Sequence, residues 1–311
     1  MTVESYPQQI LIREVGPREG FQILPKVYPL QQRLQLINAL VAASLTQIEV
    51  ASFVRGDRVP QMADAELLVA SLPQAPGVEF TALYLNAKGF ERAEQTGRLL
   101  NRGWLYTSPS NTFLHANNNL TVDQSVANIP EWIRLFRAHG KGAYGLMISN
   151  AFGCAYEGKI AISTVVSLAE RCIAACEASG ERPKELCLAD TVGMANPRHV
   201  KDCVAAIRAL NIPISLHLHD TVGLGLANVY AGLVEGVKIF ETSIGGIGGC
   251  PFTPGAAGNV ATEDVTHLCH ELGVRTNLNL DLLCEAARQA EFIIGMQLPG
   301  RVYRARSAKK P

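Results

Sequence analysis

The feature of this 311-residue sequence that most restricts its fold is a regular alternation of short apolar runs with longer amphipathic stretches. The runs are bounded by glycine, proline and polar residues, which is typical of strands. The stretches between them carry apolar residues at helical spacing. The predicted strands cover residues 10–15, 47–51, 78–84, 104–107, 143–149, 185–190, 212–219 and 237–242. The predicted helices cover residues 30–43, 62–72, 87–96, 125–139, 162–178, 197–210, 224–235, 260–272 and 281–294.

Eight alternations of strand and helix indicate a parallel sheet covered by helices, because parallel strands need crossover connections. Eight such units in roughly 250 residues fit a closed (β/α)8 TIM barrel better than an open, doubly wound sheet. No change of composition divides the chain, so we predict one α/β domain over residues 1–311. The barrel is expected at about 10–245, extra C-terminal helices at about 260–294, and a flexible tail at 295–311.

Composition argues against several classes of function. The 28 basic residues balance the 28 acidic ones, so net charge favours neither a nucleic acid nor a membrane partner. The sequence has no long apolar span, and its polar first residues lack the apolar core of a signal peptide. The eight cysteines contain no CxxC pair, which suits reduced thiols. We therefore expect a cytoplasmic protein.

Two histidines, His217 and His219, stand two residues apart near the end of a predicted strand. Alternate residues of a strand share a face, so the two imidazoles would form half of a metal site. The alternative for an isolated pair of this kind is one core histidine and one surface histidine. Other polar residues near strand ends decide between these interpretations.

Such residues follow or end several of the predicted strands. Arg18 and Glu19 come after the first strand, Glu49 lies in the second, and Asp190 ends the sixth. Each would also serve as an ordinary loop residue, and Asp190 as a helix cap. In a TIM barrel, however, the carboxyl ends of the strands surround the active site, so we expect these side chains to converge. Imidazole nitrogens with carboxylate and amide oxygens suit Mg²⁺ or Mn²⁺, whereas zinc favours sulfur-rich, tetrahedral sets.

A glycine-dense stretch with Cys250 near its centre follows the last predicted strand. Such a backbone can fold over a ligand, and a thiol with a tuned pKa can act there as an acid or a base. The alternative is a buried structural thiol.

Five segments stand out as motifs: EVGPREGFQ at 14–22, GCAYEGK at 153–159, HLHDT at 217–221, GGIGGCPFTPGAAGN at 245–259 and ATED at 261–264. Together they resemble the motifs of the 3-hydroxy-3-methylglutaryl-CoA (HMG-CoA) lyase family, from about Ile10 to about Ile294. The resemblance implies a metal-dependent lyase with a (β/α)8 barrel. Its reaction would be retro-Claisen cleavage of an HMG-CoA-like thioester to acetyl-CoA and a 3-oxo acid, which is acetoacetate for the parent substrate.

The resemblance also implies roles for individual residues. The residues that match the family's metal ligands are Glu19, His217, His219 and Asn259. The residues that match its catalytic groups or line the same site are Arg18, Cys250, Asp190 and Glu49. The general base would be His217 or Asp190. The implied cofactor is Mg²⁺ or Mn²⁺, CoA enters as part of the substrate, and the implied partner is a second copy of the chain in a homodimer or higher homo-oligomer.

Three departures from the family pattern indicate an altered substrate. Glu19 stands where the family usually has aspartate, which moves the carboxylate by about 1.3 Å. Ile23-Leu24-Pro25 replaces a polar stretch, and Asn150 stands where many relatives carry cysteine. A related thioester such as 3-hydroxy-3-isohexenylglutaryl-CoA or citramalyl-CoA is therefore an alternative substrate. Further alternatives are an aldolase or condensing enzyme of the same barrel superfamily and a ligand binder without turnover.

Overall fold

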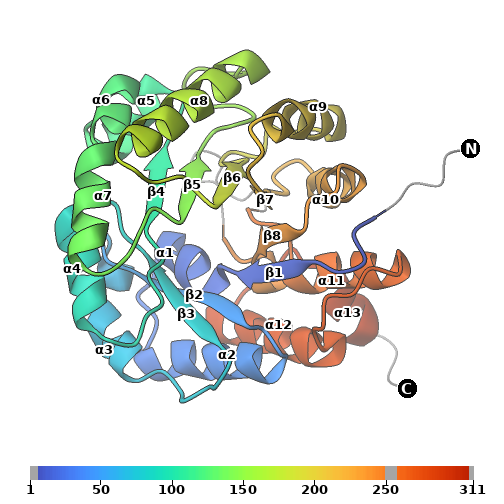
Figure 1. The fold of residues 1–311 in the computed structure, drawn as a ribbon. Helices are drawn as coiled ribbons and strands as arrows, with labels where there is room; N and C mark the ends of the chain where they lie inside the picture. The colour runs from blue at the N-terminus through green and yellow to red at the C-terminus, as the bar shows by residue number, and fades with distance from the viewer. Residues whose placement is uncertain (1–5, 249–257, 308–311) are drawn as a thin grey trace, which may run out of the picture. The chain divides into compact units, whose positions relative to one another are not determined.

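The computed structural model describes residues 6–248 and 258–307. The chain divides into two compact units, which are described separately. Unit 1 comprises Met1–Pro7 and Arg102–Ile239, and unit 2 comprises Gln8–Asn101 and Phe240–Pro311. In both units strands alternate with helices along the chain (Figure 1). This alternation confirms the predicted α/β class. That the whole chain forms one domain stays a prediction.

Unit 2 contains four neighbouring strands in the order β3-β2-β1-β8. They are β1 (Leu11–Glu14), β2 (Gln47–Ser52), β3 (Glu79–Leu83) and β8 (Ile239–Thr242), whose first residue belongs to unit 1. The longer helices are α2 (Leu30–Ala42), α3 (Ala65–Ala70), α4 (Ala87–Gln95), α11 (Thr262–Glu271), α12 (Leu280–Ile294) and α13 (Val302–Ser307). Short turns are η1 (Gly16–Gly20), α1 (Phe21–Ile23), η2 (Pro60–Met62) and η3 (Ile244–Gly246). Helix α12 packs against α2, α11 and α13.

Unit 1 contains the other four strands, in the order β7-β6-β5-β4, and they pair in parallel. They are β4 (Trp104–Thr107), β5 (Gly145–Ile148), β6 (Glu185–Ala189) and β7 (Ile214–His217). The helices are α5 (Asn111–Asn118), α6 (Val122–Ala127), α7 (Ile129–Ala138), α8 (Ile162–Ala178), α9 (Pro197–Arg208) and α10 (Gly225–Val234). Every residue of β6 is buried, as expected for a parallel strand with helices on its sheet.

Three features differ from the sequence prediction. Residues 125–139 form parts of two helices, α6 and α7, instead of one, and α5 was not predicted. Strand β7 ends at His217, two residues earlier than expected. The order of the strands and helices is otherwise as predicted.

The tail predicted to be flexible is in part helical, so that prediction is wrong for residues 302–307. The Asp264 carboxylate accepts hydrogen bonds from the backbone N–H groups of Arg301 (3.0 Å) and Val302 (2.8 Å) at the start of α13. Tyr303 is buried and donates to the Leu298 carbonyl at 3.2 Å. A capped first turn and a buried aromatic ring stabilise a segment whose basic composition suggested disorder.

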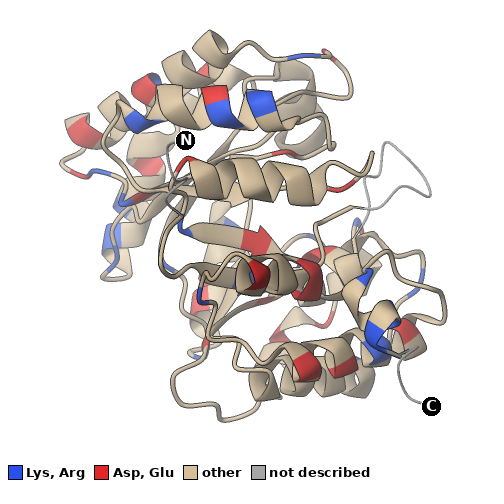
Figure 2. Cartoon of the chain, turned by 90° about the vertical axis from the view of Figure 1, so that its right-hand side faces the viewer, with Lys and Arg blue, Asp and Glu red and all other residues tan. Residues whose placement is uncertain are grey.

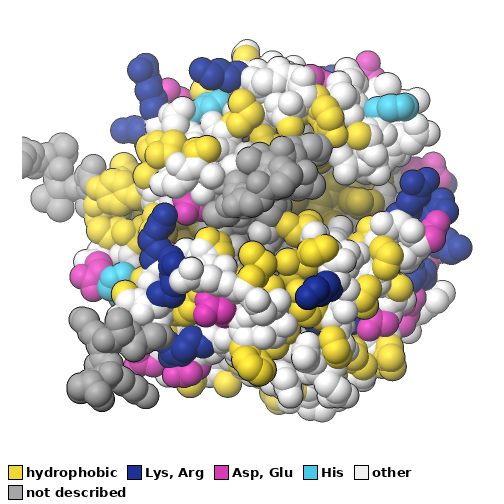
Figure 3. Space-filling model, turned by 180° about the vertical axis from the view of Figure 1, so that it is seen from behind, with side chains coloured by type: hydrophobic (Ala, Val, Ile, Leu, Met, Phe, Trp, Pro, Cys, Tyr) yellow, Lys and Arg dark blue, Asp and Glu magenta, His cyan; other side chains and the backbone are white. Residues whose placement is uncertain are grey.

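Charged residues of both signs are interspersed along the outer helices (Figure 2). The face drawn in Figure 3 likewise carries no extended patch of one charge within the described ranges. Among the residues that the structure describes, no helix is both long and apolar enough to span a bilayer.

Candidate active site

In unit 2 the turn η1, directly after β1, presents Arg18 between two carboxylates. The guanidinium Nη2 lies 3.1 Å from Glu19 Oε2, and its Nε donates to Glu49 Oε1. The turn needs glycine at both ends. A Cβ on Gly16 would lie 2.6 Å from the Glu14 Oε1 atom, and one on Gly20 would lie 2.6 Å from the Ile247 side chain. The predicted convergence of Arg18, Glu19 and Glu49 is therefore observed within this unit.

Glu49 is a partly buried carboxylate next to this arginine. Burial raises its pKa, and the neighbouring Arg18 charge opposes the rise. The negative charges of Glu241 and Glu19 raise the pKa further. Arg18 is therefore the positive charge that favours the ionised form of Glu49.

Asn259 joins the same group from the segment before α11. Its Nδ2 donates to Glu19 Oε1 at 3.0 Å and to the Ile247 carbonyl at 3.4 Å. Its Oδ1 is buried without a hydrogen-bond partner among the described residues. Gly248 lies against this amide with φ 129°, and a Cβ there would lie 2.6 Å from the Asn259 Nδ2. The backbone thus approaches Asn259 at a position that only glycine can occupy.

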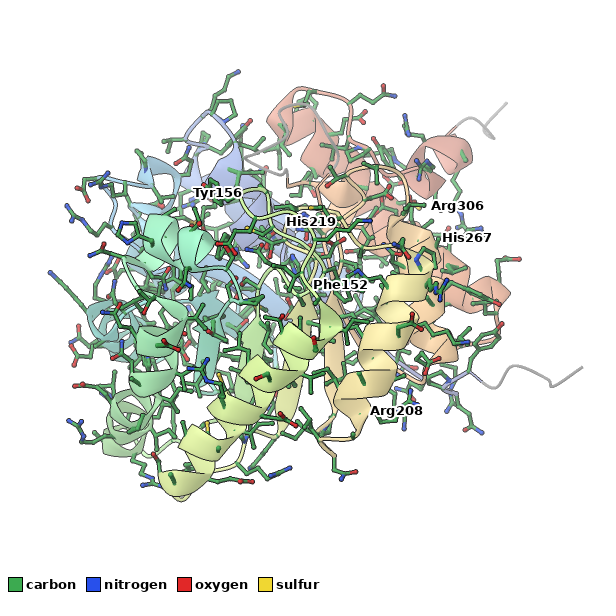
Figure 4. The ribbon with its side chains drawn as sticks, turned by 90° about the horizontal axis from the view of Figure 1, so that it is seen from above. Phe152, Tyr156, Arg208, His219, His267 and Arg306 are labelled. Atoms are coloured by element: carbon green, nitrogen blue, oxygen red, sulfur yellow. The ribbon has the colours of Figure 1, made fainter. Side chains whose placement is uncertain are left out.

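In unit 1 both histidines of the HLHDT motif are buried, and their rings lie side by side. The two Nε2 atoms are 3.1 Å apart, and the ring planes are tilted by 52°. The predicted pairing is therefore found, although His219 lies just beyond the end of β7. Figure 4 labels His219 together with Phe152 and Tyr156, which lie in the loop after β5 of the same unit. Phe152 packs edge-on against His199, with ring centroids 5.4 Å apart.

Asp190 follows β6 and is linked to the histidine strand through the backbone. Its N–H donates to the His217 carbonyl at 2.8 Å. Its Oδ1 accepts from the backbone N–H groups of Met194 (2.8 Å) and Ala195 (3.1 Å), while Oδ2 is buried without a hydrogen-bond partner in the described ranges. Burial raises the pKa of this carboxyl, opposed by the neighbouring His219 and His217. Asp190 therefore shapes a turn; the cap of α9 is Asn196, which excludes that alternative role for Asp190.

Each unit contains donor atoms of the kinds that bind a hard divalent cation. Unit 2 offers the Glu19 carboxylate and the buried, unpartnered Oδ1 of Asn259. Unit 1 offers two adjacent imidazoles, those of His217 and His219. Carboxylate, amide and imidazole donors without thiolate suit Mg²⁺ or Mn²⁺. The remaining predicted site residue, Cys250, lies outside the described residues.

Two buried polar residues near these groups were missed by sequence reasoning. Glu14, the last residue of β1, accepts three hydrogen bonds, which are described below. Glu241 in β8 lies 4.0 Å from Arg13 and adds to the negative charge around Glu49. The signal was present in the sequence as acidic residues inside otherwise apolar strands.

The HMGL-like family model matches residues 9–289, and the chain belongs to this family. The family resemblance drawn from the motifs is confirmed.

Relatives of known name match over nearly the full chain. A 3-hydroxy-3-isohexenylglutaryl-CoA/hydroxymethylglutaryl-CoA lyase of Pseudomonas aeruginosa is 33% identical, over 98% of this chain and 99% of that protein. The structure of the Bacillus subtilis HMG-CoA lyase has a TM-score of 0.89 at 34% identity, covering 97% of this chain and 99% of that one. An HMG-CoA lyase from Acinetobacter baumannii in complex with coenzyme A and 3-methylmalate has a TM-score of 0.86 at 34% identity, covering 98% and 97%. These likenesses confirm the predicted TIM-barrel class.

Proposed function

We propose that this chain cleaves an HMG-CoA-like 3-hydroxyacyl-CoA thioester into acetyl-CoA and a 3-oxo acid. As a member of the HMGL-like family it is a carbon–carbon lyase. The observation that carries the specific proposal is the group formed by Arg18, Glu19, Glu49 and Asn259 in unit 2. It combines one oriented arginine with a carboxylate and an unpartnered amide oxygen. CoA as part of the substrate is supported by the complex of the Acinetobacter relative with coenzyme A.

The residues that would hold a divalent cation are Glu19, His217, His219 and Asn259. A bound Mg²⁺ or Mn²⁺ would supply Lewis acidity, which lowers the pKa of a coordinated hydroxyl.

Asp190 is the group best suited to take the proton of the substrate's 3-hydroxyl. Two backbone N–H groups fix its Oδ1, and its buried Oδ2 has no partner among the described residues. Burial raises its pKa toward the range in which a carboxylate is an effective base. We prefer Asp190 to His217, because the His217 Nε2 atom lies 3.1 Å from the His219 Nε2 atom.

Loss of the hydroxyl proton lets the C–O⁻ electrons form a carbonyl as the adjacent C–C bond breaks. The electron pair of that bond passes to the CoA thioester and generates the enolate of acetyl-CoA. Arg18 would donate hydrogen bonds to the thioester oxygen as its negative charge develops. Glu49 holds the Arg18 Nε and so sets the direction of the guanidinium.

The enolate carbon must finally be protonated to give acetyl-CoA. The family resemblance assigns this step to Cys250, and its role as general acid is part of the proposal. The closing proton transfer balances the proton that Asp190 removed.

A related thioester is a second candidate substrate. Asn150, which follows β5, is buried, with its Oδ1 unpartnered among the described residues. Its φ of 57° is a left-handed conformation that asparagine tolerates. A polar amide here, together with the longer Glu19 carboxylate, favours an acyl group different from that of HMG-CoA. The name of the Pseudomonas relative includes the branched isohexenyl thioester.

Acetyl-CoA release from HMG-CoA, 3-hydroxy-3-isohexenylglutaryl-CoA and citramalyl-CoA tests the proposal, with Mg²⁺ or Mn²⁺ and with EDTA. We expect metal-dependent cleavage of at least one thioester. Metal-independent cleavage would contradict the metal assignment. No cleavage of any thioester, with turnover of a free hydroxy-oxo acid, would establish an aldolase instead. Homo-oligomerisation and a cytoplasmic location remain predictions, which gel filtration and cell fractionation would check.

A further inference from the structure

We propose that Glu14 is a positioning residue, whose buried carboxylate links the turn that carries Arg18 and Glu19 to the two segments, η3 and the start of α11, that lie on either side of Asn259 in the sequence. The inference rests on the proposed function for the roles of those three residues. The Glu14 side chain takes no part in the proposed steps of thioester cleavage.

Glu14 is the last residue of β1 and is completely buried. Its Oε1 accepts hydrogen bonds from the backbone N–H groups of Gly16 (2.8 Å) and Ile244 (2.9 Å). Its Oε2 accepts from the Thr262 hydroxyl at 2.6 Å. Thr262 Oγ1 is in turn 2.6 Å from the Thr242 Oγ1 atom. One carboxylate therefore accepts from three donors, the most distant of which lies 248 residues away from Glu14 in sequence.

The three donors begin the segments that hold the site. Gly16 opens the turn η1, two residues before Arg18 and three before Glu19. Ile244 opens η3, and the carbonyl of Ile247 just after this turn accepts from the Asn259 amide. Thr262 opens α11, three residues after Asn259. Because Glu14 bonds to all three, the spacing between Arg18, Glu19 and Asn259 depends on one side chain.

The chemistry of the contacts calls for an acceptor-rich group. Two of the donors are backbone N–H groups, and a buried donor without an acceptor is destabilising. Alanine at position 14 would leave all three donors without their acceptor. Glutamine would keep an oxygen for the Gly16 and Ile244 N–H groups and would donate from its Nε2 to the Thr262 hydroxyl, which can also accept. Burial raises the Glu14 pKa to about 7, and the three hydrogen bonds oppose the rise.

A purely structural role and a positioning role predict different results. A structural glutamate would affect the melting temperature alone, whereas a positioning residue would also change metal affinity and turnover. Residues that orient metal ligands typically change affinity or activity by about 10–100-fold when they are removed. The matched control is Glu185, another fully buried glutamate, which opens β6 in unit 1 and is bonded to the Tyr144 hydroxyl.

The test compares wild type with Glu14→Ala, Glu14→Gln and Glu185→Ala. The measurements are the Mn²⁺ dissociation constant by electron paramagnetic resonance without thioester, kcat and KM with thioester, and the melting temperature. We expect Glu14→Ala to weaken Mn²⁺ binding and lower kcat by about 10–100-fold. Glu14→Gln should stay within about fivefold of wild type, as neutral hydrogen bonds replace charge-assisted ones. Glu185→Ala should lower the melting temperature with unchanged Mn²⁺ binding. Wild-type Mn²⁺ binding and kcat in Glu14→Ala, or equal weakening in Glu185→Ala, would overturn the proposal.

A second pair of variants covers the case in which Glu14→Ala does not fold. Thr262→Val removes one donor with little change of shape, and Thr262→Ser keeps the hydroxyl. We expect Mn²⁺ binding to weaken in the valine variant and to recover in the serine variant. Equal Mn²⁺ binding in both would overturn the proposal.

Hydrogen exchange separates this inference from the proposed function. If wild type cleaves no thioester, the proposed function fails, but the Glu14 contacts still predict faster amide exchange at residues 16–20 and 243–247 in the Thr262→Val variant than in the serine variant. Equal exchange at these residues would reject the positioning role by itself.

Discussion

The two units hold their site residues by different means. In unit 2 charged side chains orient one another: Arg18 binds Glu19 and Glu49, and the Asn259 amide binds Glu19. In unit 1 the backbone provides most of the support. Asp190 is fixed by two peptide N–H groups, and the Asn150 N–H donates to the Thr191 hydroxyl at 2.9 Å.

This difference has consequences for substitution. A side chain held by peptide N–H groups keeps its place when its charge is removed, provided that it retains an acceptor oxygen. A side chain held by an opposite charge does not keep its place when its own charge is removed, because the charge of its partner is then left buried without a counter-charge. In unit 1, a variant that removes only the charge should therefore lower activity with little loss of stability. In unit 2, such a variant should lower both activity and stability.

The largest effect on turnover is expected in unit 1, from Asp190→Asn. The asparagine Oδ1 can still accept from the N–H groups of Met194 and Ala195, so the turn should persist. Removal of the proposed base should lower kcat by about 10²–10⁴-fold. The measurement is steady-state acetyl-CoA release, with the melting temperature as the structural control. The surface variant Asp202→Asn, in α9, should match wild type in both. A nearly unchanged kcat in Asp190→Asn would transfer the base to His217.

Arg18→Gln is the corresponding change in unit 2. We expect kcat to fall by about 10²–10³-fold, because a donor to the developing oxyanion is lost. Mn²⁺ binding should persist, since the proposed ligands remain. Unlike Asp190→Asn, this variant should also melt at a lower temperature, because Glu19 and Glu49 lose their shared cation.

The control for Arg18→Gln is Arg13→Gln, a partly buried arginine of β1 bonded to the Gln47 carboxamide. It should lower the melting temperature with a much smaller loss of kcat. Loss of Mn²⁺ binding in Arg18→Gln would show that Arg18 holds the site together instead of acting on the substrate.

Much of the fold was predictable because local sequence and tertiary burial agree. Strand β4 and helix α8 occupy the predicted residues, since an apolar run and a long amphipathic period leave few alternatives. Helix α5 was missed because Asn111–Asn118 is rich in asparagine, a poor helix former. It is held by its ends, with Ser110 as N-cap and Asn119 in a left-handed conformation. Helix α13 was missed because its stability comes from Asp264, which is distant in sequence.

The candidate site was predictable at the level of motifs but not of contacts. Arg18, Glu19, His217 and His219 could be found because polar groups at strand ends stand out. The role of Glu14 could not, because its partners Ile244 and Thr262 are more than 200 residues away. The spacing of donors around one buried carboxylate is a property of the folded chain alone.

A smaller effect, on stability, is expected where the C-terminal tail meets unit 2's glycine-rich turn. The Gly300 N–H donates to the Gly245 carbonyl at 2.9 Å, and the Gly245 N–H donates to Glu263 Oε2 at 2.9 Å. A Cβ on Gly300 would lie 2.2 Å from the Glu263 Oε1. Gly300→Ala should therefore destabilise the protein by about 1–3 kcal/mol through overpacking, measured by urea unfolding. In a Glu263→Ala background, Gly300→Ala should lower the free energy of unfolding much less. An equal decrease in both backgrounds would contradict the proposed clash.

The smallest expected effect is on the pH dependence of stability, and it is expected in unit 2 and not in unit 1. Burial, together with the negative charge of Asp264, raises the pKa of Glu263 to about 8. An unfolded glutamate titrates near its ordinary value, so between that value and about 8 the folded state binds the extra proton. The stability that this proton contributes is present at low pH and is lost as the pH rises through about 8. Glu263→Gln removes the titration, so its melting temperature should fall less than that of wild type between pH 6 and pH 9. Glu185→Gln in unit 1 is the matched control, and a wild-type pH dependence in Glu263→Gln would show that Glu263 is already ionised at neutral pH.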